Sequence, residues 1–140
     1  MKTVYRYNQP PYGLHDMIFN KIEIRNDDVI LHFPEGIVKI GEPYQTVNGT
    51  ITLESCDFDF CFVHLQAPYG MLGQYTGEKL ELKDFVDKYQ WRDFEVSAEY
   101  HGYNISVYDG YFSRFNGEDK VVEATVEIYH WGDVVYNTEE

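Results

Sequence analysis

Apolar and polar side chains alternate with a period of two along most of the chain, which is typical of β-strands with one buried face. In residues 17–25, Ile18, Ile22 and Ile24 share one face, and charged side chains share the other. Asn26-Asp27 then predicts a tight turn, because both residue types tolerate positive φ. Residues 28–33 resume the alternation, so we expect a β-hairpin over residues 17–33.

Several further segments have the same period. Residues 58–65 are apolar on both faces apart from Asp59 and His64, which indicates a strand near the centre of a sheet. Three glycines and a proline in residues 67–77 predict a loop, and the last three residues are expected to fray. The other predicted strands are 36–41 after a turn at 34–36, 50–55, 94–100 before a turn at 101–102, 103–107, 111–115 and 122–130.

One helix is predicted over residues 78–90, because Leu82, Phe85, Val86 and Tyr89 fall at helical spacing. Eight or nine strands joined by short turns indicate a mainly β fold. We expect an antiparallel β-sandwich or a partly open barrel with this helix covering one sheet face. A length of 140 residues is typical of a single domain, residues 1–140.

The charge of the chain restricts its partners. Eleven Lys and Arg residues against 24 Asp and Glu residues give a net charge of −13. Phosphate contacts need basic side chains, so the sequence argues against nucleic-acid binding and against an anionic membrane surface. A basic protein would be attracted by this charge. The 13 tyrosines suit both a half-buried core and a contact surface.

The sequence indicates a cytoplasmic protein without a cofactor. The N-terminal residues lack the apolar stretch of a signal peptide, and no run approaches the roughly 18 apolar residues of a membrane span. Cys56 and Cys61 are expected to be free thiols that point to opposite faces of a regular strand. The five histidines show no metal-ligand spacing, so no metal site is predicted.

Catalytic motifs are also missing from the sequence. It contains no G-x-S-x-G, no P-loop and no dinucleotide fingerprint. Paired carboxylates are frequent only because the chain is acidic. We therefore predict that the protein is not an enzyme. A deep pocket that gathered His15, Asp16 and His64 would argue for the opposite.

The tripeptide Pro-Tyr-Gly occurs twice, around Tyr12 and around Tyr69. Proline presets φ and glycine permits positive φ, so turn chemistry alone explains both copies. The functional interpretation is that the two tyrosine-bearing loops line one end of the domain and form a binding rim. His15 and Asp16 follow only the first copy, where Asp16 can accept backbone hydrogen bonds at the strand entrance.

The stretch GLHDMIFNKIEIRNDDVILHF, with Leu14-His15-Asp16 at its start, resembles the opening of small bacterial β domains. Some of these domains are similar to immunity proteins of polymorphic toxin systems. The resemblance covers about 20 of the 140 residues. It implies a β fold and a gene beside a toxin gene, but no reaction.

We therefore expect a non-enzymatic binding protein, namely an immunity-like inhibitor that binds and covers a basic surface of a partner protein. The alternative is a small-ligand-binding β-barrel with an apolar cavity lined by Phe58, Phe60 and Phe62. The sequence leaves the oligomeric state open. The residues expected to contact a partner are Tyr12, His15, Asp16, Glu54, Asp57, Asp59, Tyr69 and Tyr75.

Overall fold

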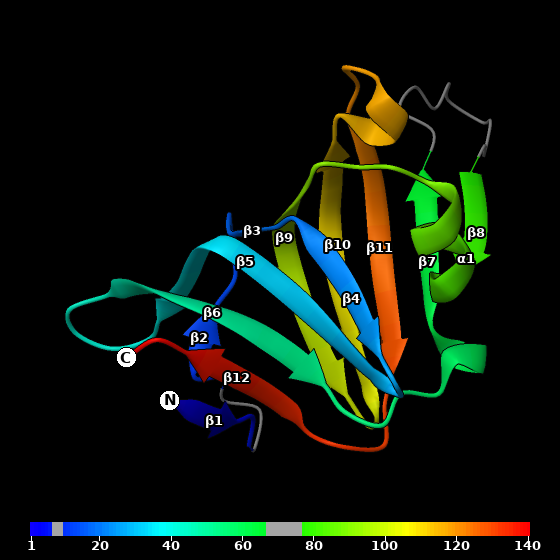
Figure 1. Cartoon of the computed structure of the whole chain (residues 1–140). Coiled ribbons are helices and arrows are strands. Elements are labelled where there is room, and N and C mark those ends of the chain that lie inside the picture. Colours follow the sequence, from blue (N-terminus) through cyan, green and yellow to red (C-terminus); the bar gives the residue numbers. More distant parts are fainter. Residues whose placement is uncertain (7–9, 67–76) are drawn as a thin grey trace.

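The protein consists of two antiparallel sheets packed face to face, with a short α-helix at one side (Figure 1). A computed structural model describes residues 1–6, 10–66 and 77–140. Within these residues there are twelve strands, six in each sheet, and one α-helix, α1 (Leu82–Lys88). The predicted class, a mainly β sandwich or partly open barrel with one helix, is confirmed. Among the described residues, no helical segment has the length and apolar character needed to cross a membrane.

The strands of each sheet are arranged as follows. The first sheet has the order β1 (Lys2–Val4), β12 (Val134–Thr138), β6 (Gln45–Leu53), β5 (Asp28–Lys39) and β2 (Tyr12–Gly13), and β4 (Lys21–Arg25) also pairs with β5. The second has the order β3 (Ile18–Phe19), β9 (Asp93–Gly102), β10 (Ile105–Ser113), β11 (Val122–Tyr129), β7 (Phe62–Gln66) and β8 (Gly77–Glu81). Two 3-10 turns, η1 (Phe58–Phe60) and η2 (Phe115–Gly117), complete the structure.

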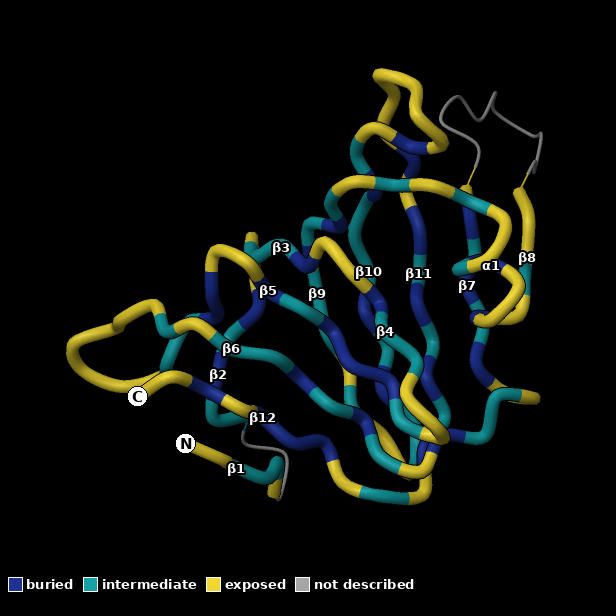
Figure 2. The backbone as a smooth tube through the Cα atoms, viewed as in Figure 1, coloured by how far each residue is buried: buried dark blue, intermediate teal, exposed yellow. Residues whose placement is uncertain are grey.

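The core lies between the inner faces of the two sheets (Figure 2). Aromatic rings fill much of it: Phe19 stacks on Phe94 with ring centroids 4.7 Å apart, and Phe85 of α1 packs against Phe112 at 5.1 Å. Such rings bury large apolar areas and stabilise the fold strongly. Three tyrosines are also core residues, namely Tyr12, Tyr108 and Tyr136.

The predicted hairpin is present as β4 and β5, with Arg25 opposite Asp28 and Asn26 at a φ of +55°. The predicted turn at residues 34–36 is instead a bulge inside the 12-residue strand β5. Gly36 has a φ of +93°, and a Cβ there would lie 2.7 Å from the carbonyl oxygen of Val47. Only glycine fits this position, and it lets the strand bend and continue rather than end.

Three other predicted boundaries differ from the structure. Residues 78–81 belong to strand β8, which pairs with β7, so the helix begins only at Leu82. Residues 58–60 form η1, so the strand expected over residues 58–65 begins at Phe62. Residues 105–113 form one strand, because a bulge at Gly110 lets β10 continue; a Cβ there would lie 1.9 Å from the carbonyl oxygen of Glu95.

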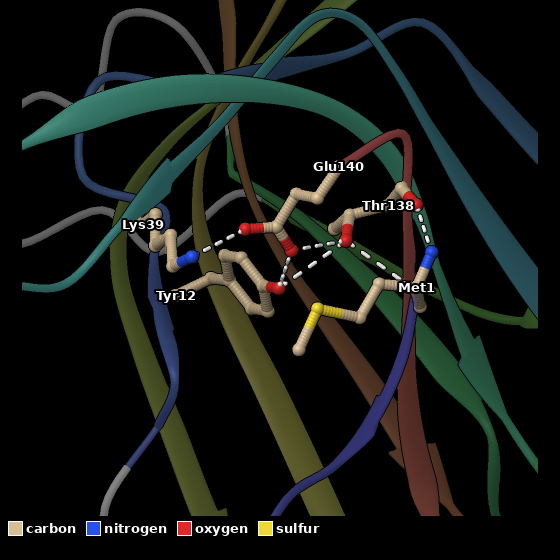
Figure 3. A network of polar contacts seen from close by, with 5 residues as sticks. All are labelled: Met1, Tyr12, Lys39, Thr138 and Glu140. Atoms are coloured by element: carbon tan, nitrogen blue, oxygen red, sulfur yellow. Dashed lines mark hydrogen bonds and ion pairs between the residues drawn. The ribbon is translucent and has the colours of Figure 1, made fainter.

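The strands nearest the two chain ends were missed by the sequence pattern. β12 lies between β1 and β6, with Thr3 opposite Tyr136. Residues 138–140, expected to fray, take part in contacts instead: Thr138 is a strand residue, and the Glu140 side chain is held by several hydrogen bonds (Figure 3).

Candidate functional site

Two chain connections meet at one end of the sandwich and form a small ladder of their own. Residues 54–57 lie between β6 and η1, and residues 130–133 lie between β11, which ends at Tyr129, and β12. The left-handed conformation of Ser55, with a φ of +53°, turns the first connection alongside the second. The ladder bonds run from Asp57 N to Tyr129 O (2.9 Å), Trp131 N to Ser55 O (2.9 Å), Gly132 N to Glu54 O (3.0 Å) and Glu54 N to Asp133 O (3.0 Å).

This ladder holds a row of aromatic rings at the surface. The ring of Tyr129 lies 5.8 Å from that of Phe60 and 5.4 Å from that of Trp131, centroid to centroid. Phe60 is 57% exposed and Trp131 is 63% exposed. Single exposed rings are normal on a protein surface, whereas a group of neighbouring exposed rings is typical of contact surfaces.

Carboxylates surround the rings. Asp57 caps η1 by accepting a hydrogen bond from the backbone N of Asp59 (3.1 Å), and Glu54 and Asp133 lie in the ladder. Among the described residues, Asp133 is the one member of this group with an ion pair, to Arg6 at 3.6 Å. The group is called the aromatic–acidic surface, and its members are Phe60, Tyr129, Trp131, Glu54, Asp57, Asp59 and Asp133.

The residues predicted as a contact face do not all lie together. Asp57, Asp59 and Glu54 belong to the aromatic–acidic surface. Tyr12 is only 2% exposed, so its ring belongs to the core and not to a binding rim. Tyr69 and Tyr75 lie outside the described residues.

The exposed side chains of His15 and Asp16 contact each other, with 3.1 Å between Nδ1 and Oδ2. They lie between β2 and β3, away from η1 (Figure 1). The backbone N of Asp16 donates to the carbonyl oxygen of Val96 (2.8 Å) at the strand entrance. His64 lies on β7 beside Glu127, so these three residues do not gather in one pocket.

A chain of four polar contacts lies at the same end of the molecule, beneath the ladder. His101 Nε2 is 3.0 Å from Glu99 Oε2, and His101 Nδ1 is 2.8 Å from Ser106 Oγ. Ser106 Oγ is 2.9 Å from His130 Nε2, and His130 Nδ1 is 2.9 Å from the carbonyl oxygen of Gly132. We call Glu99, His101, Ser106 and His130 the buried relay.

The relay is almost fully enclosed. Ser106 is 0% exposed, and the side chains of His101 and Glu99 are 8% and 16% exposed. Burial lowers the pKa of His130, and the neighbouring His101 lowers it further. A cavity of about 170 Å³ lies against His101, Ser106 and His130.

The order carboxylate, imidazole, hydroxyl in the relay resembles an activated serine nucleophile. Here the hydroxyl lies between two imidazoles. His130 Nδ1 must donate to the Gly132 carbonyl, so a neutral His130 accepts the hydroxyl hydrogen of Ser106 at Nε2. The hydroxyl is therefore occupied and buried, and we assign the relay a structural role. Sequence analysis missed it because the turn was expected at residues 101–102, whereas it lies at Tyr103-Asn104.

The two cysteines lie directly behind the aromatic–acidic surface. Both are buried free thiols; Cys56 Sγ donates to Leu53 O (3.2 Å), and Cys61 Sγ donates to Asp57 O (3.3 Å). The bend at η1 places the two thiols near each other, whereas a regular strand would separate them. The neighbouring thiol raises the pKa of Cys56 and lowers that of Cys61, and burial raises both.

At the opposite end of β12, the Glu140 carboxylate is paired at both oxygens (Figure 3). Glu140 Oε1 lies 2.7 Å from Lys39 Nζ, and Glu140 Oε2 accepts hydrogen bonds from Tyr12 and Thr138, each at 2.6 Å. These contacts lower the pKa of Glu140 from 4.5 to about 2, with the Lys39 hydrogen bond as the largest cause. The amino group of Met1 donates to the carbonyl oxygen of Thr138.

The first sheet also carries a polar groove of about 770 Å³ on its surface. Five of its residues follow one another across the strand register: Lys2, Asn137, Thr50, His32 and Lys21. The interior, in contrast, is packed with apolar side chains.

The three phenylalanines expected to line an apolar cavity do not point into a common cavity: Phe58 and Phe62 are half-buried, and Phe58 packs against the core. Phe60 is exposed, and the lysines Lys83 and Lys79 lie over the rings of Phe58 and Phe62 at 4.2 and 4.1 Å. They do not form the cavity that a small-ligand carrier would need.

No family model, curated protein or solved structure matches this chain. Among the described residues, no three His, Cys, Asp or Glu side chains are arranged so that they could hold a metal ion together.

Proposed function

We propose that the protein binds a basic partner protein through the aromatic–acidic surface, in the manner of an immunity-like inhibitor. One observation carries the proposal: Phe60 and Trp131 are exposed on either side of Tyr129, and the surrounding carboxylates Asp57 and Asp59 have no ion-pair partner among the described residues. Trp and Tyr supply most of the binding energy at protein interfaces, and unpaired charges steer the partner.

The chemistry of this surface suits a cationic cleft. In a basic cleft that binds nucleic acid, the carboxylates of this surface can occupy the positions of the phosphates, opposite Lys and Arg side chains. The aromatic rings can occupy the positions of the bases, or of apolar side chains. The net charge of −13 adds long-range attraction. The resemblance around Leu14-His15-Asp16 supports a toxin domain encoded beside the gene as the partner.

The test is a titration of the purified protein with basic toxin domains encoded beside its gene, at about 50 and about 300 mM salt. We expect a nanomolar complex whose affinity falls as salt increases. A missing complex, or one insensitive to salt, contradicts the proposal.

A matched pair of variants localises the contact. Asp57→Asn combined with Asp59→Asn removes two charges from the aromatic–acidic surface. Glu118→Gln combined with Asp119→Asn removes the same charge beside η2, at the other end of the second sheet (Figure 1). We expect only the first pair to weaken binding strongly. Equal effects would mean that total charge, and not this surface, attracts the partner.

A further inference from the structure

The number of hydrogens in the buried relay does not match the number of its contacts. A carboxylate and a carbonyl oxygen only accept, a neutral imidazole has one N–H, and a hydroxyl has one O–H. Two neutral imidazoles and Ser106 supply three hydrogens, but the relay makes four contacts of 2.8 to 3.0 Å between Glu99 and the Gly132 carbonyl. Four hydrogen bonds therefore require one additional proton.

We propose that the buried relay holds one extra proton as an imidazolium on His101, and that this proton fixes His130 and hence Trp131 next to it. In this state every contact has one hydrogen. His101 donates to Glu99 and to Ser106, Ser106 donates to His130, and His130 donates to the Gly132 carbonyl.

The position of Glu99 is a second, independent reason for a charge on His101. The Glu99 side chain is only 16% exposed, and a buried carboxylate needs a cation or several donors nearby. Among the described residues, its ion-pair partner is His101, with no Lys or Arg within reach. An imidazole is more basic than a carboxylate, so the shared proton resides on His101 rather than on Glu99.

The other titratable groups around the relay do not supply this charge. Burial raises the pKa of the three tyrosines among them, and the thiol pair raises that of Cys56, so all four stay neutral near pH 7. Asp133 is already paired with Arg6. The groups that face the relay are Tyr5 after β1, Tyr108 on β10, Tyr136 on β12, Cys56 after β6 and Asp133 before β12.

Loss of the proton leaves the relay one hydrogen short. A neutral His101 must keep its hydrogen on Nε2, because a bare Nε2 facing the Glu99 carboxylate would place two acceptors together. The single Ser106 hydroxyl hydrogen then faces two acceptors, His101 Nδ1 and His130 Nε2, and can serve only one of them at a time. The Ser106–His130 bond, which joins the β11–β12 connection to β10, is therefore weakened.

The consequence for binding rests on the proposed function, whereas the proton itself is a property of the free protein. His130 precedes Trp131, and the backbone N of Trp131 donates to Ser55 O in the ladder. Weakening of the Ser106–His130 bond should loosen this segment. Binding of a basic partner should then weaken as the proton is lost.

The test is nitrogen-15 NMR of the histidine rings in the free protein between about pH 5 and pH 9. We expect His101 to be protonated on both ring nitrogens and His130 on Nδ1 only, with both spectra changing at one common midpoint. Exposed His15 serves as an internal reference outside the relay. The protection factor of the Trp131 amide, which removes the base-catalysed rise of exchange with pH, should fall up to about fivefold above the midpoint, as expected when one neutral hydrogen bond is weakened.

The variant Glu99→Gln makes the test specific. A glutamine amide can donate to a bare His101 Nε2, so all four contacts form with neutral rings and the pH step should disappear. Glu95→Gln, on the same strand beside Tyr111, should keep the step. A His101 that is neutral over the whole range in the wild-type protein overturns the proposal, and so does a pH step that survives in Glu99→Gln. If that variant does not fold, the wild-type ring spectra alone decide.

Discussion

At one end of β12, the Glu140 carboxylate is held by Lys39, Tyr12 and Thr138 (Figure 3). At the other end, Asp57 and Asp59 lie beside exposed aromatic rings and, within the described residues, form no ion pair. The first arrangement satisfies every oxygen of the carboxylate and covers the core. The second arrangement leaves two carboxylates and the apolar area of the aromatic rings exposed to solvent. Carboxylates that stabilise the fold are held by internal partners. Under the proposed function, a partner protein supplies the contacts that Asp57 and Asp59 do not make within the described residues.

Replacing Tyr12 should have the largest effect and should act on stability alone. Tyr12→Ala empties a core position that is 2% exposed, and we expect a loss of about 3–5 kcal/mol in the free energy of unfolding. Tyr12→Phe removes only the hydroxyl that bonds Glu140 and Thr138, at a cost of about 1–2 kcal/mol. Urea denaturation measures both. Tyr44→Ala, at a 71% exposed tyrosine, is the control and should stay within about 0.5 kcal/mol.

Replacing Trp131 should have the reverse pattern. The indole is 63% exposed, so Trp131→Ala should leave the unfolding free energy within about 0.5 kcal/mol of the wild type. Its affinity for the basic partner should fall about 30-fold or more, which corresponds to about 2 kcal/mol at an interface hot spot. Calorimetric titration measures this loss. If Trp131→Ala lowers the free energy of unfolding but keeps the affinity, Trp131 stabilises the fold and does not contact the partner.

The acid dependence of stability should separate the two ends further. The pKa of Glu140 is lowered in the folded protein from 4.5 to about 2, so its contacts contribute stability above pH 4.5. That contribution is lost as the pH falls toward about 2, because the unfolded state then binds the proton first. Glu140→Gln should flatten the pH dependence of thermal unfolding in this window. Glu139→Gln is the neighbouring control and should keep the wild-type curve.

The smallest effect is expected for the stability of Asp57→Asn combined with Asp59→Asn. Asparagine caps a helical turn as well as aspartate does, and Asp59 is exposed, so the unfolding free energy should change by less than about 0.5 kcal/mol at pH 7. Thermal unfolding measures it. A larger loss would mean that these carboxylates stabilise the fold, and the contrast between the two ends would then be weaker than proposed.

The hydrophobic pattern predicted most strands correctly where one face is buried. The hairpin of β4 and β5 is an example, because its alternation and its Asn26-Asp27 turn agree. The pattern failed where glycine permits a bulge: at Gly36 and Gly110 a local kink resembles a turn in sequence, although the strand continues. It also failed at β12, whose residues are almost all buried and so show no alternation.

The candidate site was predictable only in part. Acidic residues in short connections indicated Asp57 and Asp59, but the pairing of two distant connections placed Trp131 and Tyr129 beside them, and no local pattern encodes such pairing. The buried relay was missed because the turn lies two residues later in the chain than the sequence pattern predicts. With the turn at Tyr103-Asn104, where Asn104 has a φ of +57°, the hairpin register places His101 opposite Ser106.

A single residue, Asn20, separates β3 of the second sheet from β4 of the first. One short stretch of chain therefore supplies a strand to each layer, and neither layer can be completed while the other is missing. Unfolding should accordingly be cooperative, with near- and far-ultraviolet circular dichroism giving the same transition midpoint.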